Sequence, residues 1–100
     1  MCGIAGVYNS NGLSELDKIS IHPMTEILAH RGPDDQGFYS DECISLGQRR
    51  LSIIDLSGGK QPMCNEDRTI WIIFNGEIFN YIELMNMLKK KGHRFSTRSD

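Results

Sequence analysis

The sequence has few cysteines, and these show neither a disulfide framework nor a metal site. The three cysteines, Cys2, Cys43 and Cys64, are odd in number and widely spaced, and no positively charged and apolar leader accompanies them. No pair among them and the three histidines has the spacing of zinc ligands. We therefore expect no metal, no secretion and a cytoplasmic location.

Long apolar runs and an excess of charge of one sign are also missing. No apolar run approaches the ~18 residues that a membrane helix needs. The 11 Lys and Arg against 13 Asp and Glu give a formal net charge of −2, which does not favour nucleic acid or a membrane surface as a partner. A chain of 100 residues holds one domain at most, residues 1–100, and small molecules are the favoured partners.

The chain does contain several short strand patterns. Residues 44–50 follow residues 38–41 across a turn at Asp41-Glu42, which predicts an antiparallel hairpin. The β-branched and aromatic run over residues 69–74 is apolar on both faces, as in a central strand. Further strands are predicted at residues 3–8 and 94–97, and the mixture of strands and helices predicts an α+β fold.

Two helical patterns separate these strands. Ser14 is a suitable cap for the first helix, whose apolar face would comprise Ile19, Met24, Ile27 and Leu28, with Pro23 starting or kinking it. Gly32 suits a left-handed cap at its end. A second helix is predicted over residues 80–91, with a capping-box-like start at Asn80 and Glu83 and an end at Gly92.

Cys2 is a candidate nucleophile because it directly follows the initiator methionine. Removal of Met1 would leave a thiol and an α-amine on one residue, and an α-amine with a pKa near ~7.7–8.0 can act as a base around neutral pH. This combination is typical of an amino-terminal nucleophile, in which one residue supplies both the attacking group and the base. The alternative is a small buried hydrophobe at the start of a core strand, and taken alone Cys2 favours that alternative.

Polar residues cluster in two further segments. The segment HRGPDDQG, residues 30–37, is either a solvated turn, which residue physics favours, or a rigid wall of a site with Arg31 pairing a carboxylate. In the second segment, Arg49 and Arg50 would face opposite sides of a strand, so only one can point into a cleft. We expect Arg50 to bind an α-carboxylate through its planar fork and Arg49 to form a surface salt bridge.

Asn75-Gly76, at the end of the apolar run, also has two interpretations. Asn-Gly pairs are typical of hairpin turns. An asparagine amide and a glycine N–H can equally form a two-donor pocket for a developing oxyanion, provided that a nucleophile lies nearby. Residues 57–62 form a predicted turn whose glycines, Gly58 and Gly59, lack the spacing and following helix of a phosphate loop, so no nucleotide is expected there.

Together, MCGIAGVY, HRGPDDQG, RLSIIDL, GGKQP and NGEIFNY closely resemble the glutamine amidotransferase domain of glutamine-hydrolysing asparagine synthetases, a class II branch of the amino-terminal-nucleophile hydrolases. The resemblance implies part of an αββα sandwich that hydrolyses L-glutamine without a cofactor. It further implies that Cys2 is the nucleophile, Arg50 binds the α-carboxylate and Asn75 with Gly76 forms the oxyanion hole. The implied remainder of the glutamine site comprises Leu51, Ser52, Ile53, Ile54, Glu77 and Asp100.

The family's amidotransferase domain is longer than this chain, and an ATP- and Mg-dependent synthetase domain normally follows it and uses the ammonia to convert aspartate to asparagine. We therefore expect the chain to be an amino-terminal portion that hydrolyses glutamine poorly by itself. An unpaired sheet edge makes a homo-oligomer possible. Two alternatives stay open: a related enzyme that aminates a sugar or another acceptor, and a non-catalytic fragment that keeps only the fold.

Overall fold

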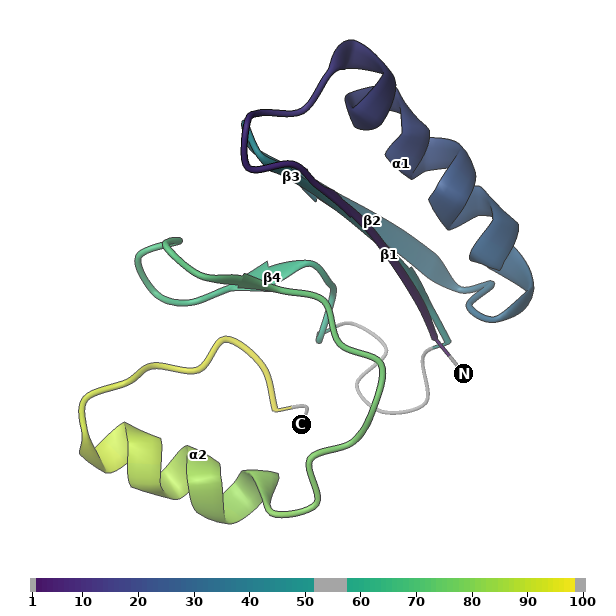
Figure 1. The fold of residues 1–100 in the computed structure, drawn as a ribbon. Helices are drawn as coiled ribbons and strands as arrows, with labels where there is room; N and C mark the ends of the chain where they lie inside the picture. Colours follow the sequence, from purple (N-terminus) through teal and green to yellow (C-terminus); the bar gives the residue numbers. More distant parts are fainter. Residues whose placement is uncertain (1, 52–57, 99–100) are drawn as a thin grey trace.

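A computed structural model describes residues 2–51 and 58–98 of the chain. Within them, β1, β2 and β3 form one antiparallel sheet in the order β1-β3-β2, and β4 and β5 form a second, antiparallel pair. The helices and strands confirm the predicted α+β class and are consistent with part of an αββα sandwich (Figure 1). The elements are β1 (Gly3–Tyr8), α1 (Glu15–Ile27), the 3-10 turn η1 (Leu28–His30), β2 (Asp35–Ser40), β3 (Ile44–Arg50), β4 (Met63–Cys64), β5 (Trp71–Ile72) and α2 (Tyr81–Lys90).

The predicted hairpin between β2 and β3 is confirmed. Its turn is fixed by Asp41, whose Oδ1 accepts the backbone N–H of Cys43 at 2.8 Å and of Ile44 at 2.9 Å. These two hydrogen bonds lower the pKa of the Asp41 carboxyl, because they favour its charged form. β2 begins at Asp35, earlier than predicted, since Asp35 pairs with Arg50 across the sheet.

Helix α1 covers one face of the three-stranded sheet (Figure 1). The predicted cap is confirmed: Ser14 Oγ accepts the Asp17 N–H at 3.1 Å, and the Asp17 carboxylate accepts the Ser14 N–H at 3.0 Å. The predicted apolar face is wrong, because Ile21 and Thr25 are the buried residues of α1.

The reason lies in β3, where a Cβ added to Gly47 would meet Thr25 Oγ1 at 2.0 Å and Ile21 Cγ1 at 3.3 Å. Helix and strand therefore approach each other at a glycine. This close approach buries the residues that face Gly47 and leaves Ile19 and Ile27 exposed, at 61% and 74%. Pro23 lies inside α1.

The second sheet is much smaller than the sequence predicts. β5 comprises Trp71–Ile72 and pairs with Met63–Cys64, so the expected central strand over residues 69–74 is wrong. Within the described residues β5 has this one short partner, and Ile70 and Ile72 remain 67% and 49% exposed. Residues 94–97 form no strand.

Helix α2 follows the second sheet and agrees closely with its predicted extent. Asn80 is its N-cap residue but makes no side-chain cap hydrogen bond, so the predicted capping box is wrong. The end is as predicted: Gly92 has φ of 96°, and the His93 N–H donates to the Leu88 carbonyl at 3.1 Å. Neither this helix nor α1, the helices of the described ranges, combines the length and apolarity needed to cross a bilayer.

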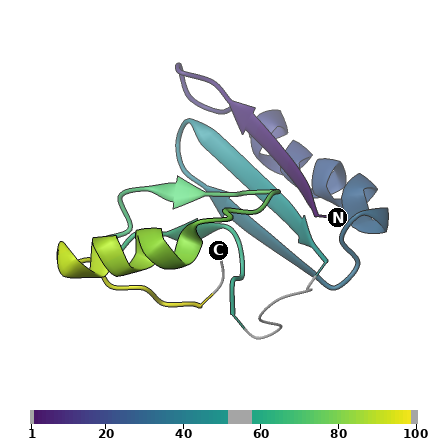
Figure 2. The ribbon, with the colours of Figure 1, turned by 90° about the horizontal axis from the view of Figure 1, so that it is seen from below.

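The second sheet and α2 lie on the other side of the first sheet from α1 (Figures 1 and 2). Among the described residues, contacts at Trp71 and at Gln61 join the parts. Tyr39 of β2 stacks on Trp71 of β5, with ring centroids 4.2 Å apart and an interplanar angle of 18°. The backbone of Gln61 packs against Gly37, where an added Cβ would lie 1.8 Å from the Gln61 carbonyl oxygen. Both contacts use the face of the first sheet that α1 leaves uncovered.

Candidate active site

Cys2 is held in place at the start of β1. Its Sγ accepts the Leu51 N–H at 3.4 Å and lies 3.9 Å from the Leu51 carbonyl oxygen. The Cys2 carbonyl oxygen accepts a hydrogen bond from Arg31 Nε at 3.2 Å. The residue is half-buried. Cys2 is therefore ordered by contacts from two other segments of the chain and is not enclosed in a core.

The two arginines at the end of β3 differ as the sequence predicts. Arg50 is buried, with 6% of its surface exposed. Arg49 is half-buried and lies on the other face, where its Nε donates to the Gly32 carbonyl at 2.8 Å and its Nη1 donates to Gln36 Oε1 at 2.9 Å. Arg49 forms no salt bridge among the described residues, so the predicted one is not found there, and these two neutral oxygens take its hydrogen bonds.

Within the segment of residues 30–37, Pro33 and Asp34 are exposed as in a solvated turn, whereas residues 35–37 belong to β2. Gly32 is buried, and a Cβ on it would lie 2.4 Å from the Arg49 carbonyl carbon and 2.5 Å from the Arg50 nitrogen. Gly32 does not have the predicted left-handed conformation, since the left-handed glycines of the described ranges are Gly12, Gly59 and Gly92. It is required here for close approach of two backbones. Arg31 binds the Cys2 carbonyl, where a carboxylate had been predicted.

The strand register places Cys2 and Arg50 on the same face of the sheet. Gly3 pairs with Arg49, and the hypothetical Cβ of Gly3 points at Leu28 on the α1 side. Because successive residues of a strand alternate between faces, Cys2 and Arg50 both belong to the opposite face. Cys2, directly before β1, and Arg50, the last residue of β3, thus lie on the face that α1 leaves uncovered.

Gln48 lies on that same face, between Ile4 and Gly37 in the register. It is 1% exposed, and its Nε2 has no hydrogen-bond acceptor among the described residues. Sequence reasoning did not identify Gln48, because a glutamine inside a strand pattern carries no signal of burial.

Asn75, Gly76 and Glu77 lie in the loop between β5 and α2 and are exposed. No strand follows them within residues 77–98, so the hairpin interpretation of Asn75-Gly76 is wrong. Gly76 packs against the ring of Phe74, whose Cζ would lie 2.8 Å from a Cβ at position 76. Of the other predicted positions, Leu51 contacts Cys2, whereas Ser52, Ile53, Ile54 and Asp100 lie outside the described residues.

The sequence matches one known protein family over its whole length. A family described as "Glutamine amidotransferase domain" matches residues 1–100. The chain belongs to the glutamine amidotransferase family.

Three relatives of this chain are named asparagine synthetase [glutamine-hydrolyzing]. The chain is 50% identical over 102 residues to asparagine synthetase [glutamine-hydrolyzing] 1 of Bacillus subtilis, and the match covers 100% of the chain and 16% of that protein. Asparagine synthetase [glutamine-hydrolyzing] 1 of Arabidopsis thaliana is 41% identical, and the protein of Zea mays with this name is 42% identical, each over 100 residues. The chain spans 17% of each of these plant proteins.

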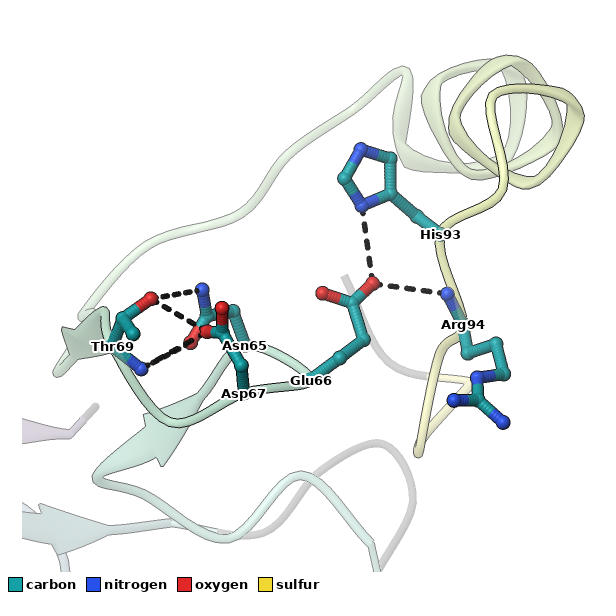
Figure 3. Close-up of polar contacts among 6 residues, drawn as sticks. All are labelled: Asn65, Glu66, Asp67, Thr69, His93 and Arg94. Atoms are coloured by element: carbon teal, nitrogen blue, oxygen red, sulfur yellow. Dashed lines mark hydrogen bonds and ion pairs between the residues drawn. The ribbon is translucent and has the colours of Figure 1, made fainter.

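The amidotransferase chain also contains a cavity of about 450 Å³ between the second sheet, α2 and the segment after α2. Gly76 and Phe74 line one part of it. Another part is lined by Glu66, whose Oε1 accepts His93 Nδ1 at 3.1 Å and the Arg94 N–H at 3.0 Å (Figure 3). Hydrogen bonds from its own backbone N–H, from Arg94 and from His93 lower the pKa of Glu66.

A second polar cluster closes the turn between β4 and β5 (Figure 3). Asn65 Oδ1 accepts the Thr69 N–H at 2.8 Å, and the Thr69 hydroxyl donates to Asp67 Oδ1 at 2.6 Å. The Thr69 hydroxyl and N–H lower the pKa of Asp67. These bonds fix the turn that leads into β5 and so towards the Asn75-Gly76 loop.

Proposed function

We propose that this chain hydrolyses the side-chain amide of L-glutamine, with Cys2 as an amino-terminal nucleophile. The observation that carries the proposal is the placement of Cys2 and Arg50 on one face of the sheet, with the Leu51 N–H on the sulfur. The family match over the whole chain supports the same chemistry. The names of the relatives, which specify glutamine hydrolysis, support glutamine as the substrate.

In the proposed reaction, Met1 is removed and the new α-amine of Cys2 accepts the thiol proton. The sulfur attacks the side-chain carbonyl carbon of glutamine, and the C–N bond breaks after the nitrogen receives that proton. Ammonia leaves, and a γ-glutamyl thioester remains on Cys2. Water then attacks the thioester, which releases glutamate and restores the thiol.

Arg50 would bind the α-carboxylate of glutamine through its planar guanidinium, and Glu77 with Asp100 would bind the amino group. The Asn75 amide and the Gly76 N–H would donate to the oxygen that becomes negative in the tetrahedral intermediate. The backbone of residues 51–54 would shape the pocket between them. No metal or other cofactor takes part in these steps.

We further propose that the ammonia is used in asparagine synthesis. The supporting observation is that relatives at 41% to 50% identity are named asparagine synthetases. The ATP- and Mg-dependent domain that would activate aspartate lies outside this sequence. Sequence following position 100 that contains an adenylate-forming pyrophosphatase motif would support this acceptor, whereas a sugar-binding domain there would contradict it.

The experiment for glutamine recognition is covalent labelling of Cys2 by a diazo-ketone analogue of glutamine. We expect labelling of Cys2 alone, protection by L-glutamine and no protection by D-glutamine. Arg50→Gln should abolish the protection, because the α-carboxylate loses its partner, while Arg49→Gln on the opposite face is the matched control. Labelling that glutamine does not slow would contradict the proposal and favour a non-catalytic fragment.

A further inference from the structure

Gln61 connects the two parts of the proposed active site. Cys2 and Arg50 belong to the first sheet, whereas Asn75 and Gly76 belong to the loop after β5. In the proposed reaction the oxyanion forms on the carbon that bonds to the Cys2 sulfur, so the loop must keep a fixed distance from the first sheet. Contacts between the two parts therefore have to set that distance.

The backbone of Gln61 is packed against the first sheet. A Cβ on Gly37 of β2 would lie 1.8 Å from the Gln61 carbonyl oxygen, 2.9 Å from its carbonyl carbon and 3.0 Å from Pro62 Cδ. Only a glycine at position 37 permits this approach. Gly37 pairs with Gln48 in the centre of the sheet, on the face that also carries Cys2 and Arg50.

The side chain of Gln61 holds the other part. Its Oε1 accepts the backbone N–H of Phe74 at 2.5 Å, in a half-buried position. Phe74 directly precedes Asn75, and its ring lies against Gly76, with Cζ 2.8 Å and Cε2 3.1 Å from the position of a Cβ there. One hydrogen bond thus fixes the residue that both leads into the Asn75-Gly76 loop and supports it.

We propose that Gln61 is a positioning residue for glutamine hydrolysis, which sets the place of the Asn75-Gly76 loop relative to Cys2 by accepting the Phe74 N–H. This inference rests on the proposed function. Gln61 touches neither the glutamine nor the sulfur in this scheme. Its effect should therefore appear in the transition state, where the loop donates to the oxyanion, and not in the binding of glutamine by Arg50.

The test compares Gln61→Leu, which removes the acceptor, with Gln61→Glu, which retains an oxygen acceptor at the same place. For Gln61→Leu we expect kcat for glutamate release to fall about 10- to 100-fold, the size of effect typical of a displaced oxyanion donor, with KM within about threefold. Gln61→Glu should stay close to the unchanged chain. Lys60→Ala, at the exposed neighbouring residue, is the matched control.

Two further measurements separate positioning from a general loss of structure. The rate at which iodoacetamide alkylates Cys2 should not change in Gln61→Leu, because this displacement at carbon forms no oxyanion. Hydrogen exchange at the Phe74 N–H should accelerate in Gln61→Leu and not in Gln61→Glu. A second route to the same loss is Gly37→Ala, which pushes the Gln61 backbone off the sheet while leaving its side chain intact.

The outcomes are distinguishable. If the unchanged chain releases no more glutamate than Cys2→Ala, the proposed function is wrong and the role of Gln61 in it fails with it. If the unchanged chain is active and Gln61→Leu retains its kcat, or if Phe74 exchange is unaffected, the function stands and the positioning role is wrong. A fall in kcat together with an equal fall in Cys2 alkylation would also overturn it, in favour of a purely structural residue.

Discussion

Substituting Gly47 by alanine tests the packing that places the first sheet under α1. The new Cβ would lie 2.0 Å from Thr25 Oγ1 and 3.2 Å from Thr25 Cβ. Thr25 is 0% exposed, and its hydroxyl donates to the Ile21 carbonyl at 2.7 Å. The hydroxyl therefore has to leave its hydrogen bond, or the helix has to move away from the strand.

The expected cost follows from these two effects. Overpacking of a buried contact costs about 1 to 3 kcal/mol, and the loss of one hydrogen bond adds about 1 kcal/mol. We expect Gly47→Ala to lower the free energy of unfolding by about 2 to 4 kcal/mol, which corresponds to a decrease in Tm of about 10 to 30 °C for a domain of this size. Urea unfolding followed by circular dichroism measures it.

Gly6→Ala is the matched control, because a Cβ there meets Leu46 Cδ2 at 3.4 Å, an ordinary contact. It should remain within about 1 kcal/mol of the unchanged chain. Combining Gly47→Ala with Thr25→Ala removes the clashing hydroxyl, so the losses should fall short of additivity by about 1 kcal/mol. Equal stability of the Gly47 and Gly6 variants, or strictly additive losses, would refute the packing argument.

Three further predictions concern single residues. Ser14→Ala should lower the free energy of unfolding by about 1 kcal/mol in urea, because α1 loses its N-cap hydrogen bond to Asp17. Hydrogen bonds lower the folded-state pKa of Asp41, so the charged carboxylate stabilises the fold fully above its unfolded-state pKa, and this stabilisation is lost as pH falls through the folded-state pKa. Asp41→Asn should remove this part of the acid dependence of stability, measured by urea midpoints between neutral and acid pH. Gln48→Met should raise the free energy of unfolding by about 1 kcal/mol, because it removes a buried donor that has no acceptor among the described residues.

Each of these has a contrary outcome. Unchanged stability of Ser14→Ala would mean that the cap does not stabilise α1 in solution. An acid profile of Asp41→Asn that parallels the unchanged chain would show that the hydrogen bonds from Cys43 and Ile44 do not hold that pKa down. A large loss of stability in Gln48→Met would show that the Gln48 amide is satisfied in solution.

Local signals in the sequence predicted much of the first sheet and both helices. Residues 3–8, the Asp41 turn, the Ser14 cap and the Gly92 stop are determined within a few residues of chain, and all four are present. The buried face of α1 could not be predicted in the same way. It is set by Gly47, far away in the sequence, which allows close approach at Thr25 and Ile21.

The same distinction applies to the candidate site. The opposite facing of Arg49 and Arg50 follows from strand alternation, and the sequence predicted it. The contacts of Cys2 with Leu51 and Arg31 join segments that are distant in sequence, so no pattern indicated them. The predicted length of β5 was too great, because an apolar, β-branched composition indicates only that a segment favours strand pairing. How many residues pair depends on the strands beside it.

The most direct test of Cys2 as an amino-terminal nucleophile is the intact mass of the chain, before and after reaction with the diazo-ketone analogue of glutamine. We expect a chain that lacks Met1 and gains one adduct, which peptide mapping assigns to Cys2, while Cys43 and Cys64 stay unmodified. A chain that retains Met1, and so has no free amine on Cys2, would contradict the proposed mechanism. An adduct on Cys43 or Cys64 in place of Cys2 would contradict the assignment of the nucleophile.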